Sequence, residues 1–144
     1  MENDNRCPKG SVGAIIEKDG RYLMLYRISF PPGLAGIAGH GKPGEDPETS
    51  MRRELIEEAG IVAEDMQLVL NKVLPNPCKK GYTSHEWWIY RVTTWSGEPR
   101  LMEPDKHTFV RFMSIDEIRD HDARNDMDPA WSMILRELEV GLIV

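Results

Sequence analysis

The strongest constraint on the fold is a helix whose two ends are both marked in the sequence. Asp46 is a favourable N-cap, Pro47 suits the first helical position, and Gly60 suits the position just past the last turn. Together these signals predict a helix over the segment Asp46 to Gly60.

The predicted helix carries an acidic face beside an apolar one. At about 100° per residue, Glu54, Glu57 and Glu58 fall within an arc of about 100°. The neighbouring apolar stripe consists of Met51, Leu55 and Ala59. Like charges at these spacings cost roughly 0.2–0.5 kcal/mol per pair, and the last turn disfavours negative charge by about 0.3–1 kcal/mol. A solvated acidic face is the ordinary explanation, but a bound divalent cation such as Mg²⁺ would offset both costs.

Composition limits the class of protein. The 144 residues are 40% hydrophobic and 29% charged, and no repeat or linker divides them, so we expect residues 1–144 to form one globular domain. No apolar run approaches the roughly 18 residues that a membrane helix needs. The N-terminus is polar where a signal peptide would be apolar. We therefore expect a cytoplasmic protein without membrane contact.

Charge and cysteine content exclude further classes. The net charge of −6 argues against binding to a nucleic-acid duplex, and an anionic ligand would need a cation as a bridge. Cys7 and Cys78 lie in no CxxC motif and in no cluster with histidine along the sequence. They are expected to be two reduced thiols rather than a disulfide or part of a zinc ribbon.

The remaining segments predict a mixture of strands and helices. Strands over 11–16 and 22–26 would join in a hairpin at Lys18-Asp19-Gly20. Residues 29–44 contain five glycines and three prolines and are expected to form a long loop. Further strands are expected over 69–74, 85–94 and 108–113, with a short helix over 114–118 and a last helix opening at Asp128-Pro129. This order indicates an α/β or α+β sandwich with a mixed β-sheet.

The predicted loop over 29–44 and the predicted helix that follows it carry a known sequence signature. Gly39, then Glu45, then the run Arg53-Glu54-Leu55-Ile56-Glu57-Glu58-Ala59-Gly60-Ile61 has the spacing and residues of the Nudix box, so the chain resembles the Nudix hydrolases. The resemblance implies a Nudix-type α/β/α sandwich with a mixed β-sheet. It also implies a pyrophosphohydrolase that uses Mg²⁺ or Mn²⁺ to cleave a nucleoside diphosphate linked to another moiety, by water attack on phosphorus. A nucleoside triphosphate or a nucleotide-sugar-like compound would be a suitable substrate.

The resemblance also implies a metal site. Glu57 and Glu58 resemble the principal metal ligands, Glu54 a ligand or a base that orients the water, and Ala38 or Gly39 the source of a main-chain carbonyl ligand.

Three other residues of the chain have implied roles in the same resemblance. Arg53 and Glu45 would hold the loop to the helix, and Arg53 would orient the catalytic carboxylates. Glu103 resembles a distant glutamate that binds a second metal or acts as the base, and its alternative is an ordinary loop acid.

Substrate contacts are less constrained by the sequence. His40 and Lys42 occupy loop positions where many members have glycine or an acid, so either side chain could contact a phosphate or remain solvated. Arg27 is another candidate phosphate contact, with a surface salt bridge as its alternative. Trp87 and Trp88 must point to opposite faces of a sheet, so at most one should face the pocket. The sequence does not choose among ADP-ribose, a dinucleoside polyphosphate and an oxidised nucleotide.

Two other functions fit a chain of this kind. One is a nucleotide-binding sensor or regulatory domain without turnover, although all the carboxylates of the box are present. The other is diphosphate isomerisation, for which neither cysteine has a supporting motif. The small-molecule partner would be a nucleoside diphosphate derivative, and the sequence is compatible with a homodimer.

Overall fold

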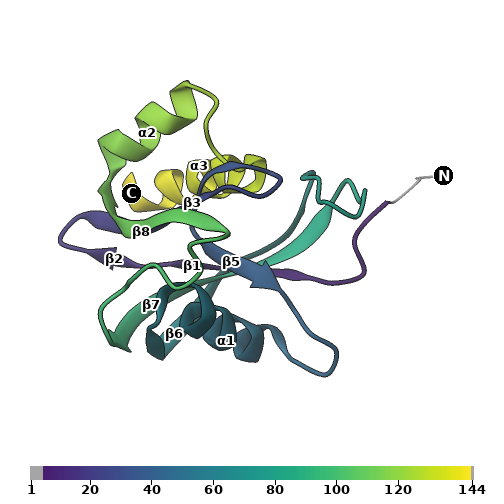
Figure 1. Cartoon of the computed structure of the whole chain (residues 1–144), viewed down its shortest axis with the longest axis horizontal. Coiled ribbons are helices and arrows are strands. Elements are labelled where there is room, and N and C mark those ends of the chain that lie inside the picture. The colour runs from purple at the N-terminus through teal and green to yellow at the C-terminus, as the bar shows by residue number, and fades with distance from the viewer. Residues whose placement is uncertain (1–4, 144) are drawn as a thin grey trace.

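The computed structural model describes residues 5–143. Its strands and helices follow one another in a mixed order, as the sequence predicts (Figure 1). The strands are β1 (Ser11–Ile15), β2 (Glu17–Lys18), β3 (Arg21–Arg27), β4 (Gly33–Ala35), β5 (Ile37–His40), β6 (Val62–Leu74), β7 (His85–Ser96) and β8 (His107–Ser114). The helices are α1 (Pro47–Ala59), α2 (Ile115–Ala123) and α3 (Pro129–Ile143).

The strands form two sheets with helices on both sides. One sheet has the order β5-β1-β7-β6 and is mixed, because β1 runs parallel to β7 while its pairing with β5 is antiparallel. In the other sheet, β3 pairs with β2, β4 and β8, always antiparallel. Figure 1 shows α1 on one side of the strands and α2 and α3 on the other. The fold is therefore the expected α+β sandwich with a mixed β-sheet.

The first hairpin is confirmed at its turn but not along its whole length. Asp19 and Gly20 have φ angles of 53° and 77°, as a tight two-residue turn requires. Of the segment before the turn, only the two residues of β2 pair with β3, whereas β1 belongs to the mixed sheet. The chain changes sheets at Ile16, which is buried and whose carbonyl accepts a hydrogen bond from Leu23 N at 2.9 Å.

The predicted long loop over 29–44 is wrong in part, because it contains β4 and β5. Leu34 and Ile37 are fully buried there, so two short strands are stabilised by tertiary packing that glycine and proline content does not reveal. Strand β5 pairs with β1, which places Gly39 opposite Val12 and His40 opposite Ser11. The signature glycine therefore lies on a sheet edge.

Helix α1 begins and ends where its caps predict. The Asp46 carboxylate accepts a hydrogen bond from Thr49 N at 2.8 Å, and Gly60 adopts the left-handed conformation with φ 69°. The apolar stripe is fully buried and consists of Met51, Leu55 and Ala59. The opposite side of the core is closed by α3, where buried Trp131 makes an edge-to-face contact with Trp87 of β7, their centroids 6.1 Å apart.

We predict that Asp46→Ala lowers the free energy of unfolding by about 1 kcal/mol, because Thr49 N loses its capping acceptor. Asp46→Asn keeps an acceptor oxygen at the same place and should change stability much less. Chemical denaturation of both variants measures the difference. Equal stability of Asp46→Ala and Asp46→Asn would show that the cap contributes nothing to α1.

Candidate metal and active site

The centre of the site is the guanidinium of Arg53, on α1. Its Nε and Nη2 donate to the two carboxylate oxygens of Glu45 at 2.8 and 3.0 Å. Nη1 donates to Glu54 Oε1 at 2.8 Å and to Glu57 Oε1 at 3.0 Å, and Nη2 also reaches the His40 carbonyl at 3.0 Å. These bonds raise the pKa of Arg53, so this cation is permanent. One side chain thus joins the loop, β5 and the acidic face of α1.

Glu45 connects the loop between β5 and α1 to the helix by hydrogen bonds. Its Oε1 also accepts hydrogen bonds from Lys42 N at 3.0 Å and from Ser50 Oγ at 2.9 Å. The hydrogen bonds from Arg53 are the main reason that the pKa of Glu45 falls to about 2. The position of Glu45 is that of a structural anchor, as the resemblance implies.

Glu54 and Glu58 are buried carboxylates held close to one another. They are 8% and 9% exposed, and the side chain of Glu57 is 43% exposed. Burial raises the pKa of Glu54, against the effect of Arg53. Burial and the neighbouring Glu54 and Glu103 raise the pKa of Glu58 further. Crowded carboxylates with one cation among them are suited to a divalent metal ion, which would restore their ionised forms.

Gly39 lets the backbone of β5 lie against these carboxylates. A Cβ atom at Gly39 would lie 2.1 Å from Glu54 Cδ, so any side chain at this position would displace the Glu54 carboxylate. The preceding residue, Ala38, donates its N–H to Glu58 Oε1 at 3.0 Å. The strand therefore brings main-chain groups beside the acidic cluster, as a carbonyl ligand from Ala38 or Gly39 would require.

Glu103 joins the cluster from the segment between β7 and β8. Its carbonyl accepts hydrogen bonds from Lys106 N and His107 N at 2.9 and 3.0 Å, and its Oε2 accepts one from Lys106 Nζ at 3.3 Å. Glu58, Glu103 and His107 each offer a ligand atom, and these atoms lie within 4.8 Å of one another. Glu103 therefore lies beside Glu58 in the fold, and its role as a base or a ligand stays a prediction.

Sequence reasoning missed His107. The residue is buried, its Nε2 lies 3.8 Å from Glu58 Oε2, and its Nδ1 has no hydrogen-bond partner among the described residues. Burial lowers the pKa of His107. No signal in the sequence identifies it, because its nearness to Glu58 depends on the pairing of β8 with β3.

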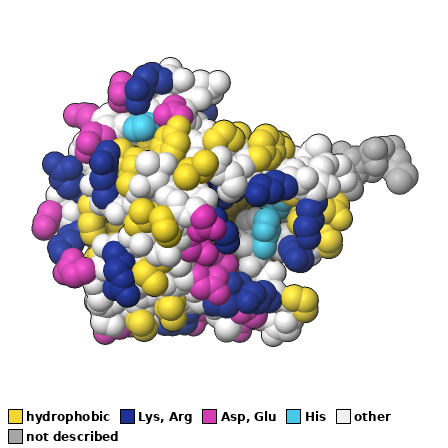
Figure 2. Space-filling model, viewed as in Figure 1, with side chains coloured by type: hydrophobic (Ala, Val, Ile, Leu, Met, Phe, Trp, Pro, Cys, Tyr) yellow, Lys and Arg dark blue, Asp and Glu magenta, His cyan; other side chains and the backbone are white. Residues whose placement is uncertain are grey.

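The acidic cluster lies along a cleft of about 530 Å³, a volume typical of small-molecule sites. Figure 2 shows the acidic side chains beside a hollow rimmed by basic side chains and a histidine. The basic residues that line the cleft are Lys9, Arg27, Lys42, Arg53, Lys79, Lys80 and Lys106. A cleft with an acidic wall and a basic rim suits an anionic ligand bridged by a metal ion.

Arg27, Lys42 and His40 all line this cleft. The Arg27 guanidinium donates to the carbonyls of Pro31 and Phe30 at 3.0 and 3.2 Å, so it also holds the rim loop. Lys42 and His40 are exposed at the rim. Partial desolvation and neighbouring positive groups lower the pKa of His40. The proposed contacts of all three with a phosphate stay predictions.

The two tryptophans point to opposite faces, as expected. Trp87 lines the cleft and donates its Nε1–H to Asn76 Oδ1 at 3.1 Å. Trp88 lines a separate cavity of about 360 Å³ beside Pro43 and Pro47. Phe30, 49% exposed, is a second aromatic side chain on the cleft.

Comparison with known proteins assigns the family. The NUDIX domain family model matches residues 8–132. An 8-oxo-dGTP diphosphatase from Haemophilus influenzae is 28% identical over 116 residues, which cover 78% of this chain and 82% of that protein. The chain belongs to the NUDIX family and is a Nudix hydrolase.

Solved structures agree with this assignment. A MutT NUDIX hydrolase from Burkholderia pseudomallei is 29% identical with a TM-score of 0.69, covering 76% of this chain and 85% of that one. A NUDIX hydrolase from Nitrosomonas europaea is 25% identical with a TM-score of 0.77, covering 94% and 90%. A C. elegans Ap4A hydrolase, 22% identical with a TM-score of 0.67 over 94% and 98%, shares the fold. Among residues 5–143, no helix is both long and apolar enough to span a membrane.

We predict that Glu58→Gln stabilises the metal-free protein at neutral pH. The raised pKa of Glu58 means that the native state binds its proton more tightly than the unfolded state does. Ionisation of Glu58 therefore lowers the free energy of unfolding as the pH rises above 4.5, the ordinary pKa of a glutamate. Glutamine keeps an acceptor for Ala38 N and removes the charge.

Melting temperatures in chelator between pH 4 and pH 8 measure this effect. The advantage of Glu58→Gln should be absent at the acidic end and grow with pH. Glu57→Gln, at the half-exposed position, is the control and should show a smaller gain. A constant or reversed difference for Glu58→Gln would contradict the burial of an uncompensated charge.

Proposed function

We propose that the protein is a metal-dependent pyrophosphohydrolase that cleaves a nucleoside diphosphate linked to another moiety, such as a nucleoside triphosphate or a nucleotide-sugar-like compound. The observation that carries this proposal is the set of Glu54 and Glu57, ordered by Arg53, and Glu58, held by the N–H of Ala38, beside a cleft with a basic rim. The similarity to an 8-oxo-dGTP diphosphatase supports nucleotide substrates.

We propose Mg²⁺ or Mn²⁺ as the cofactor, held by Glu57, Glu58, Glu54 and a main-chain carbonyl at Gly39 or Ala38. Bound there, the metal would polarise phosphate oxygens and acidify a water molecule. Arg53 orients Glu54 and Glu57 towards one side of α1, and the N–H of Ala38 fixes Glu58. Preorganised ligands of this kind lower the cost of binding a small, rigidly octahedral ion.

The substrate would lie along the cleft with its phosphates near the basic rim. Arg27, Lys42 and His40 are our candidates for phosphate contacts, since all three line the cleft. Phe30, half-exposed on the cleft, offers an aromatic face for the nucleobase, and the buried Trp87 lines the same cleft. A water oxygen would bond to phosphorus, its proton would pass to a carboxylate, and the phosphoanhydride oxygen would leave with the other phosphoryl group.

A sensor that binds a nucleotide without turnover is the alternative, and the full set of carboxylates argues against it. Three further expectations stay predictions: a cytoplasmic location, one domain over residues 1–144, and the absence of binding to a nucleic-acid duplex. The comparisons give no support for a homodimer, and we do not propose one.

Activity should require added Mg²⁺ or Mn²⁺ and disappear with chelator, whereas Ca²⁺ should support binding better than turnover because its coordination is looser. Product analysis over a panel with 8-oxo-dGTP, ordinary nucleoside triphosphates, Ap4A and ADP-ribose measures this and identifies the substrate. Glu57→Gln and Glu58→Gln should lose more than roughly 100-fold in turnover, beyond the effect of an outer-shell change. Tight binding of a nucleotide, with no turnover of any compound in the panel, would favour the sensor.

We further propose Glu103 as the general base. A carboxylate bound to a metal is a weak base, and Arg53 already occupies Glu54 Oε1. Glu103→Gln should therefore slow turnover by about 10²-fold, within the range of general-base catalysis, with little change in Mg²⁺ affinity. Single-turnover kinetics and calorimetric Mg²⁺ titration separate the two effects. Normal turnover in Glu103→Gln, with Glu54→Gln inactive but still metal-bound, would assign the base to Glu54.

A further inference from the structure

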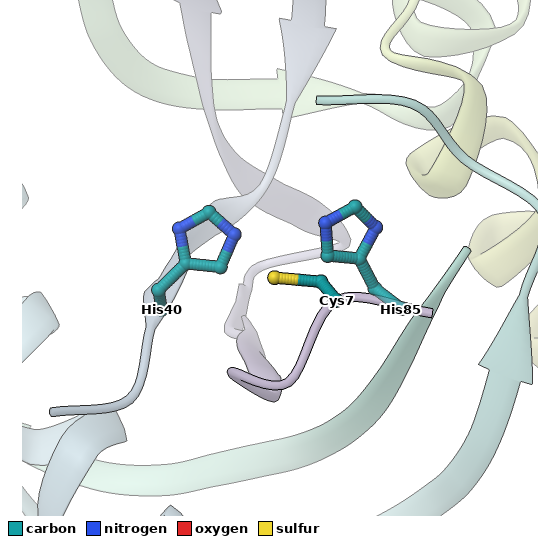
Figure 3. Close-up of side chains that lie close together, drawn as sticks. All are labelled: Cys7, His40 and His85. Atoms are coloured by element: carbon teal, nitrogen blue, oxygen red, sulfur yellow. The ribbon is translucent and has the colours of Figure 1, made fainter. Parts of the chain in front are cut away.

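A second group of metal-ligating side chains lies in the wall of the same cleft. Cys7 precedes β1, His40 ends β5 and His85 begins β7, and all three line the cleft. One ligand atom from each lies within 4.8 Å of the other two. Figure 3 shows the Cys7 thiol between the two imidazole rings. Cys7 is a free thiol, as expected, and the fold brings it beside two histidines that are distant from it in the sequence.

His85 is the observation that points to a ligand. The residue is 1% exposed, and its Nδ1 lies 3.0 Å from the carbonyl of Asn76. A carbonyl only accepts, so Nδ1 carries the proton and Nε2 has a free lone pair. Nε2 has no hydrogen-bond partner within the described part of the chain. A buried polar atom without a partner is costly, and a metal ion would satisfy it.

The arrangement of His85 is that of a metal-binding histidine. Such histidines usually donate the other ring N–H to a carbonyl or carboxylate, which fixes the tautomer and the ring orientation. For His85 this acceptor is the Asn76 carbonyl. Asn76 itself is held by a hydrogen bond from its N–H to the Leu74 carbonyl at 3.0 Å. The ring of His85 is thus oriented before any ligand binds.

The backbone holds the other two positions in place. Cys7 N donates to the Ser84 carbonyl at 2.9 Å, directly before His85. His40 is paired with Ser11 across β1 and β5. Its ring centroid lies 5.6 Å from that of His85. Sheet pairing, rather than chance contact between mobile side chains, brings the three residues together.

The chemistry of the three donors selects a different ion from the one that suits the glutamates. A thiolate with two imidazoles is a soft nitrogen and sulfur set, which favours Zn²⁺ and similar transition metals over Mg²⁺. Zn–S bonds of about 2.3 Å and Zn–N bonds of about 2.0–2.1 Å place tetrahedral ligand atoms roughly 3.3–3.6 Å apart. Because the ligand atoms lie within 4.8 Å of one another, the closure required is at most about 1.2–1.5 Å, to which rotation of the exposed His40 ring can contribute.

We propose that Cys7, His40 and His85 form a Zn²⁺ site whose fourth coordination position faces the substrate cleft. Binding forms one Zn–S and two Zn–N bonds and releases the thiol proton of Cys7 to solvent. Water or an oxygen of an anionic ligand in the cleft completes the tetrahedron. This site is separate from the oxygen ligands of α1 and does not depend on the hydrolase activity.

The test uses Co²⁺ as a spectroscopic substitute for Zn²⁺ on the reduced full-length protein, with Mg²⁺ in excess to occupy the carboxylates. A thiolate-to-cobalt charge-transfer band should appear, and one equivalent of Zn²⁺ should abolish it. The band should be lost in Cys7→Ser and retained in Cys78→Ser, the matched control because Cys78 lines the same cleft. Glu58→Gln should also retain it, whatever its effect on hydrolysis.

His40→Gln provides a second variant, at an exposed position where a substitution should leave the fold intact. Its Zn²⁺ affinity, from competition with a chromophoric chelator, should fall by more than roughly 10-fold, since a direct ligand matters at least as much as an outer-shell partner. Absence of the band in the wild-type protein would overturn the proposal. So would loss of the band in Cys78→Ser with retention in Cys7→Ser, or unchanged Zn²⁺ affinity in His40→Gln.

Discussion

The geometry of the site depends on one guanidinium. Arg53 donates to Glu45, Glu54 and Glu57 and to the carbonyl of His40, and in this way one residue fixes the loop, the sheet edge and the helix face relative to one another. A planar fork with five donors can make these contacts simultaneously, and an ammonium group cannot. Without Arg53, the carboxylates of α1 would repel one another with no cation to order them.

The same arrangement leaves an imbalance of charge among the carboxylates that a divalent metal ion would offset. Hydrogen bonds from Arg53 are the main cause that lowers the pKa of Glu45 to about 2, whereas at Glu54 burial outweighs Arg53 and raises the pKa. Glu58 is buried beyond its reach, with Ala38 N as donor and His107 nearby. The fold therefore buries two carboxylates whose ionised forms are stabilised only in part by hydrogen bonds. We infer that the binding of a divalent ion supplies the missing stabilisation and the electrophile together.

Local signals predicted the parts of the fold that depend on neighbours in sequence. The caps of α1 and the Asp19-Gly20 turn are examples, since each needs only a few consecutive residues. Strands β4 and β5 were missed because short strands are stabilised by partners distant in the chain. For the same reason, the resemblance to the Nudix hydrolases singled out Glu103, whereas nothing in the sequence indicated His107 and His85. Tertiary contacts alone bring these two histidines to the cleft.

The most direct test of the central claim is Mn²⁺ binding by Arg53→Lys, followed by electron paramagnetic resonance. This variant retains every carboxylate and a positive charge, but it loses the fork that orders Glu45, Glu54 and Glu57. If Arg53 organises the metal site, Mn²⁺ affinity should fall by roughly 10–100-fold, as for other outer-shell changes, while circular dichroism shows a native fold. Unchanged Mn²⁺ affinity in a folded Arg53→Lys protein would contradict the account.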